Sequence, residues 1–123
     1  PNSFEIRTAQ FIGKPISTAL NHDSKSCEIC DRLFTDVFVH ACFGCTCTSN
    51  MYSTWLDVII ENFSLDLYVE LSECSDESLF IICLGKDPST ALSDSDLDSF
   101  KRLCYVHVIK SASEYNQQLN YIV

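Results

Sequence analysis

The sequence lacks a hydrophobic run long enough to cross a membrane. No apolar stretch in the 123 residues approaches the ~20 residues of a membrane-spanning helix. No basic segment followed by an apolar one is visible either, although the chain starts at Pro1 and we expect it to be a fragment with sequence upstream. The length suits one domain with a single core, so we expect one domain over residues 1–123 and no membrane partner.

Basic residues are scarce relative to acidic ones. Eight Lys and Arg face seventeen Asp and Glu, which gives a formal net charge of −9. Affinity for nucleic acids comes largely from cations that displace counterions from phosphates. The charge therefore argues against strong DNA or RNA binding and favours a basic protein partner or simple solubility.

Cysteine, in contrast, is abundant, with eight residues in the chain. A secreted disulfide scaffold is one interpretation of this number. The cysteines outside the paired motifs described next lie in or beside apolar runs, where cysteine behaves as a small hydrophobic residue. These four are Cys47, Cys74, Cys83 and Cys104. A reducing compartment, with a metal on the paired cysteines and the others free, fits this distribution better.

Two Cys-x-x-Cys pairs, Cys27 with Cys30 and Cys42 with Cys45, are separated by eleven residues. A two-residue gap lets both sulfurs turn toward one ion, and four thiolates at tetrahedral corners suit Zn²⁺. We predict a structural zinc site with these four ligands, in a zinc ribbon at about residues 24–48.

Other interpretations of this segment stay open. His40 could replace a cysteine ligand, and Cys47 could form the second ligand pair with Cys45. A redox-active motif of the thioredoxin type would need a strand–helix–strand context, whereas the flanking residues resemble a hairpin.

Most of the remaining chain is rich in β-branched and aromatic residues, which favours strands. We predict strands at residues 4–12, 51–60, 65–71, 105–109 and from 118, and a hairpin arm at 33–41. Residues 79–84 fit either a buried strand or the start of a core helix. One short helix is expected where Ser93 and the following acids supply N-caps before Leu97, Phe100 and Leu103.

This order predicts an all-β domain with one short helix: a five-stranded OB-fold barrel with a zinc ribbon inserted between the first and second strands. With the four cysteines at Cys27, Cys30, Cys42 and Cys45, it resembles the C-terminal OB domain of the replication protein A large subunit and its relatives. Those relatives include the meiosis-specific OB protein and the shieldin OB subunit. The resemblance implies a nuclear complex of DNA repair, recombination or meiosis.

The sequence departs from this family on the strand that would face DNA. The family carries two aromatic residues four apart on that strand for base stacking, where this chain has Leu67 and Leu71. Tyr68 could stack only in a different register. Together with the net charge, this makes single-stranded DNA binding by the domain alone doubtful and favours assembly with a protein subunit.

The remaining candidates have ordinary structural interpretations beside functional ones. Trp55 could stack on a base or anchor a partner, although a core position is more common. Lys101 and Arg102, with Lys110, could contact phosphates or simply end a helix in solvent. A nucleophile pair at Cys104 and His107 would point to opposite faces of a strand. The run Asp94, Asp96 and Asp98 lacks the glycine and glutamate of a calcium loop, so capping is expected there.

We therefore expect a non-catalytic, zinc-containing OB-fold domain that acts mainly by binding a protein partner in the nucleus. A single-stranded DNA-binding domain is the second possibility. A small zinc-containing or thiol-dependent enzyme, or a viral zinc protein, is the third.

Overall fold

The computed structural model describes residues 24–122. It opens with a hairpin of two short antiparallel strands, β1 (Lys25–Ser26) and β2 (Leu33–Phe34). Every later element within this range is helical. In chain order these are α2 (Val37–Val39), the π-helical turn η1 (His40–Gly44), the 3₁₀ turn η2 (Thr46–Thr48), α3 (Ser49–Asn62), α4 (Leu65–Glu73), α5 (Asp76–Cys83) and α6 (Asp94–Ile122).

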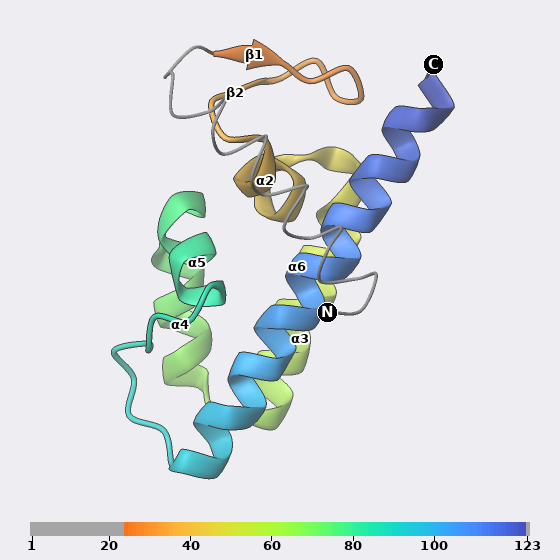
Figure 1. The fold of residues 1–123 in the computed structure, drawn as a ribbon. Helices are drawn as coiled ribbons and strands as arrows, with labels where there is room; N and C mark the ends of the chain where they lie inside the picture. Colours follow the sequence, from red (N-terminus) through yellow and green to blue (C-terminus); the bar gives the residue numbers. More distant parts are fainter. Residues whose placement is uncertain (1–23, 123) are drawn as a thin grey trace.

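The long helix α6 is the axis of the arrangement. It packs against α3 and α5 and, further along, against η1 and η2. Figure 1 shows α6 running past the shorter helices, with the hairpin near its C-terminal end. Residues at the start of the described chain therefore meet residues close to its end. No helix within residues 24–122 is both long and apolar enough to span a membrane.

The predicted five-stranded OB barrel is wrong. The segments at 51–60 and 65–71 form α3 and α4, and those at 105–109 and 118–122 are parts of α6. The hairpin arm predicted at 33–41 is a strand only at Leu33–Phe34, and residues 79–83 belong to α5. The helix expected after Ser93 is confirmed but continues to Ile122. The strand predicted at residues 4–12 lies outside the described residues.

The pattern of burial in residues 65–71, whose apolar and polar residues alternate, fits a helix. Leu67 and Leu71 are fully buried, whereas Leu65 and Val69 are 62% and 41% exposed. Residues four apart lie on one helical face, so this burial follows the helical period and not the strand period. The Ser64 side chain accepts a hydrogen bond from the Leu67 amide at 3.1 Å and caps the helix.

Serine caps also begin the two helices that follow. The Ser75 hydroxyl accepts from the Ser78 amide at 3.2 Å, and the Ser93 hydroxyl accepts from the Asp96 amide at 3.1 Å. Each serine satisfies an amide that has no partner within its helix. Only the cap at Ser93 was recognised from the sequence, because the other two serines lie in segments that also resemble turns.

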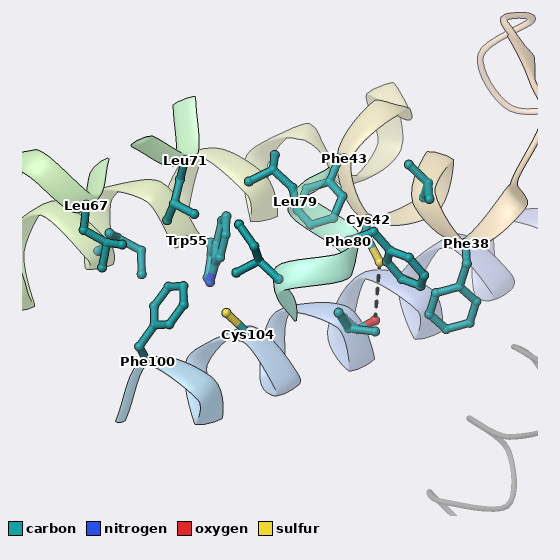
Figure 2. Packing of buried hydrophobic residues seen from close by; sticks show 14 residues of the cluster. Phe38, Cys42, Phe43, Trp55, Leu67, Leu71, Leu79, Phe80, Phe100 and Cys104 are labelled. Atoms are coloured by element: carbon teal, nitrogen blue, oxygen red, sulfur yellow. Dashed lines mark hydrogen bonds between the residues drawn. The ribbon is translucent and has the colours of Figure 1, made fainter. Parts of the chain in front are cut away.

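The buried side chains form two separate clusters. The larger one fills the space between α3, α4, α5 and α6, as Figure 2 shows for Trp55, Leu67, Leu71, Leu79 and Phe100. The smaller one lies between the hairpin, η1 and the last part of α6, around Cys27, Ala41, Cys45 and Tyr115. The smaller cluster contains the candidate functional site.

Candidate metal centre

The turn between β1 and β2 brings Cys27 and Cys30 to the inner side of the hairpin. The Cys27 amide donates to the Arg32 carbonyl at 2.8 Å, and the Asp31 amide donates to the Cys27 carbonyl at 2.9 Å. Asp31 has a φ of 62°, a left-handed conformation that aspartate tolerates better than most residues. The Ile29 amide lies 3.4 Å from Cys27 Sγ, so the turn also directs a backbone donor at the sulfur.

The turn η1 and the residue that follows it, Cys45, supply the other two candidate ligands. Asp36 begins this region by accepting hydrogen bonds from the amides of Phe38 and Val39 at 2.8 and 3.2 Å. The Cys45 amide closes η1 by donating to the His40 carbonyl at 2.8 Å. This wide turn places the side chains of His40 and Cys45 on the face that the hairpin covers.

Four side chains meet where these two turns come together. The ligand atoms of Cys27, Cys30, His40 and Cys45 all lie within 4.8 Å of one another. The two sulfurs of Cys27 and Cys45 are 4.0 Å apart, and Cys30 Sγ is 3.4 Å from His40 Nε2. Three of these residues are buried and Cys30 is partly buried. This group could hold a metal ion.

Aromatic rings fix the orientation of His40. Phe34 of β2 stacks on the imidazole with ring centroids 5.0 Å apart and planes 14° apart. Tyr115 of α6 meets it edge-on at 5.8 Å and 85°. Contacts on two sides leave Nε2 directed at the cysteines.

Tyr115 also contacts the cluster directly. Its hydroxyl lies 3.2 Å from Cys27 Sγ, and it donates a hydrogen bond when this sulfur is a thiolate. Tyr115 is 88 residues from Cys27 in the chain and only 1% exposed. No feature of the sequence marks Tyr115 as part of the site, because only the packing of α6 brings it there.

The surroundings of these groups shift their pKa values in ways that bear on metal binding. Burial, with a smaller effect of Arg32, lowers the pKa of His40 and favours the neutral imidazole that ligates metals. Burial alone would raise the pKa of the Cys27 thiol, but hydrogen bonds from Tyr115 and from backbone amides more than compensate and lower it. Burial raises the pKa of the Cys45 thiol, so this sulfur needs a cation to become a thiolate.

Cys42, which the sequence analysis assigned as the fourth ligand, lies elsewhere. It is fully buried in the larger core cluster, and its thiol donates to the Val108 carbonyl at 3.9 Å, as the dashed line in Figure 2 shows. Residues two apart in a helical turn point to roughly opposite sides, so η1 cannot direct both His40 and Cys42 at one point. The structure brings together three of the four predicted cysteines and places His40, the alternative named above, beside them.

Cys47 lies next to the cluster without belonging to it. It is partly buried and packs against the smaller cluster. The close-packed group of four ligand atoms does not include its sulfur. None of the eight cysteines forms a disulfide.

The residues considered for nucleic-acid or partner contacts are dispersed. Trp55 is 4% exposed and stacks on His107 in the core, and Tyr68 packs at the edge of the same cluster. Lys101 pairs with Asp87 and Arg102 with Asp98, each at 2.8 Å. These four candidates therefore form no common surface.

The pair Cys104 and His107 lies within the core. A hydrogen bond with Cys83, together with burial, raises the pKa of the Cys104 thiol and keeps it protonated. Burial lowers the pKa of His107 to about 4, and its Nε2 donates to the Cys42 carbonyl at 3.0 Å. Both side chains act as packed core groups in this arrangement.

A pocket of about 250 Å³ opens on the outer side of His40, away from the cysteines. Its walls include Phe34, His40 and Gly44 and three carboxylates, those of Asp36, Asp76 and Glu77. Burial, and next the Glu77 carboxylate, raise the pKa of Asp76.

Comparison with known proteins gives no matching family model, no similar curated protein and no similar solved structure. The resemblance to replication protein A required strands at residues 51–60, 67–71, 105–109 and 118–123, and the described residues of these segments are helical. The function is therefore argued from the site alone.

Proposed function

We propose that the chain is a non-catalytic helical domain stabilised by one zinc ion on Cys27, Cys30, His40 and Cys45. The observation that carries the proposal is the convergence of these four ligand atoms within 4.8 Å. Three sulfurs and one imidazole nitrogen are a donor set that suits tetrahedral zinc. Magnesium and calcium prefer oxygen ligands, which this cluster lacks.

The spacing of the ligand atoms supports a tetrahedral ion. Zinc bonds of about 2.0–2.3 Å place neighbouring ligand atoms about 3.3–3.8 Å apart. The separation of 3.4 Å between Cys30 Sγ and His40 Nε2 falls in this range, and the 4.0 Å between the sulfurs of Cys27 and Cys45 is slightly above it. The other separations are at most 4.8 Å, so these side chains would have to move closer together around an ion.

A structural role follows from the number of protein ligands and from what they connect. Four protein ligands leave no open position for substrate or water, unlike catalytic zinc sites. The hairpin has only two residue pairs, and such a hairpin is not stable by itself. A zinc ion would fasten it to η1, and structural zinc contributes ~10 kcal/mol or more to folding in small domains.

The proposal is tested by metal content and by matched variants. The reduced protein should bind one zinc per chain, and His40→Ala should bind it at least tenfold more weakly. Cys42→Ser, which alters the predicted but displaced cysteine, should keep stoichiometric zinc despite a less stable core. Elemental analysis with a chelator competition measures both. Loss of zinc in Cys42→Ser with retention in His40→Ala would contradict the ligand set.

Binding to a protein partner remains part of this proposal. The net charge of −9 supports a basic partner and disfavours a nucleic-acid backbone. The specific role in nuclear DNA repair, recombination or meiosis depended on the OB resemblance, and no contact described above favours it.

A further inference from the structure

The unused nitrogen of His40 points to a further member of the metal centre. Because Nε2 faces Cys30, Nδ1 faces the opposite way, into the pocket beside Gly44. His40 is only 6% exposed, and no residue of the described part of the chain hydrogen bonds to Nδ1. When Nε2 binds a metal, Nδ1 carries the ring proton, and this N–H of a metal-bound histidine usually has an acceptor.

Asp76, the first residue of α5, has a carboxylate that lacks a hydrogen-bond donor. Its carboxylate is partly buried in the wall of the same pocket, and within residues 24–122 neither a hydrogen bond nor an ion pair engages it. The Asp76 carboxylate is therefore an acceptor with no donor, and His40 Nδ1, which borders the same pocket, has no acceptor.

The position of Gly44 limits the distance between His40 Nδ1 and the Asp76 carboxylate. A Cβ atom at Gly44 would lie 3.1 Å from His40 Nδ1 and 3.6 Å from Asp76 Oδ2. The nitrogen and the oxygen are thus separated by no more than the sum of these distances. A water molecule, or a rotation of the Asp76 side chain, can close such a gap.

We propose that Asp76 is the positioning residue that accepts the His40 Nδ1–H when the metal is bound. This inference rests on the proposed zinc site. Histidines that bind metals usually donate their other N–H to a carboxylate or carbonyl, which fixes the tautomer and makes the imidazole a better ligand. Through Asp76, the first turn of α5 becomes part of the metal centre.

Glu77 provides a matched control for the experiment. It is the other acid in the first turn of α5 and lines the same pocket, but it is exposed. Removing either acid costs the helix one favourable charge near its N-terminus. The difference between the two variants therefore isolates the contact with His40.

The test is a zinc titration against a chelator with the wild type, Asp76→Ala and Glu77→Ala. Asp76→Ala is expected to bind zinc 10–100-fold more weakly, as is typical when such an acceptor is removed. Glu77→Ala should stay close to the wild type. In the zinc-loaded protein, NMR of His40 should show an Nδ1 proton that exchanges faster with solvent in Asp76→Ala.

The outcomes separate this inference from the proposed function. If the wild type binds one zinc and both variants match it, Asp76 has no positioning role while the zinc site stands. Equal weakening in both variants would assign the effect to the charge of the first helical turn and also overturn the inference. A wild type that binds no zinc would overturn the site itself.

Discussion

A single hydroxyl group connects the metal centre to the far end of the described chain. Tyr115 Oη lies 3.2 Å from Cys27 Sγ, and the Tyr115 ring packs against His40. A hydrogen bond to a charged group contributes about 1.5–3 kcal/mol, more than one between neutral groups. Tyr115 is therefore expected to stabilise the thiolate form of Cys27 as well as the position of α6.

The prediction at this scale concerns Tyr115→Phe, which removes the hydroxyl and keeps the ring. Zinc affinity should fall about tenfold, because about 1.4 kcal/mol corresponds to a factor of ten. In the cobalt-substituted protein, the sulfur-to-cobalt charge-transfer band should move to lower energy, because a thiolate that accepts fewer hydrogen bonds is a stronger electron donor.

Tyr121→Phe is the control for this experiment, because Tyr121 lies on the same helix but is 84% exposed. It should change neither the affinity nor the spectrum. An unchanged band in Tyr115→Phe would show that the hydroxyl does not interact with the bound thiolate.

At the scale of elements, α4 holds the connection between α5 and α6 through one side chain. The Glu70 carboxylate accepts hydrogen bonds from the amides of Ser89 and Thr90 at 2.6 and 2.7 Å and from the Thr90 hydroxyl at 2.6 Å. Burial acts to raise the pKa of Glu70, but these hydrogen bonds outweigh it and lower the pKa. The charged carboxylate therefore stabilises the fold.

Replacing Glu70 with Gln should lower the free energy of unfolding by about 1 kcal/mol at neutral pH, since the charge and part of the acceptor capacity are lost. Urea denaturation of the zinc-loaded protein measures this change. Glu73→Gln, an exposed acid on the same helix, is the control and should have little effect.

The pH dependence of this contribution has a defined sign. Because the folded pKa of Glu70 lies below the ordinary value of 4.5, its stabilisation is complete above that value. It is lost as the pH falls through the lower folded pKa. The difference between the wild type and Glu70→Gln should therefore be constant near neutral pH and shrink in acid. A difference that grows in acid would contradict this account.

The same elements show what the sequence could predict. The two-residue gap predicted that Cys27 and Cys30 lie together, because such a gap is a local property of the chain, whereas Cys45 lies beside them without its predicted partner Cys42. The choice between His40 and Cys42 depended on the π-helical form of η1, which spacing alone does not specify. The alternation from Leu65 to Leu71 indicated a strand, whereas the Ser64 cap and the burial of Leu67 and Leu71 belong to a helix.

At the scale of the whole molecule, the four residues considered for nucleic-acid contacts do not form a binding surface. Lys101 and Arg102 are paired with carboxylates, and the aromatic residues Trp55 and Tyr68 pack in or against the core. A nucleic-acid surface needs free cations and exposed rings close together. The described part of the chain places these four residues in no such group.

We therefore predict that a labelled oligonucleotide of about 20 nucleotides does not bind the zinc-loaded domain with micromolar affinity, even at low salt. Fluorescence anisotropy at several salt concentrations measures this. Zinc removal by a chelator is the companion measurement, because it shows whether any weak signal depends on the folded metal centre. Tight binding with a steep salt dependence would instead favour a single-stranded DNA-binding domain.

The separation of 88 positions between Cys27 and Tyr115 has a consequence for the order in which the protein matures. Translation proceeds at about 5–20 residues per second, so the hairpin and η1 leave the ribosome several seconds before Tyr115. All four proposed zinc ligands lie within residues 27–45, so nascent chains can capture the ion early. Until α6 arrives, that ion lacks its covering helix, and newly made chains should release zinc to competing chelators more readily than finished ones.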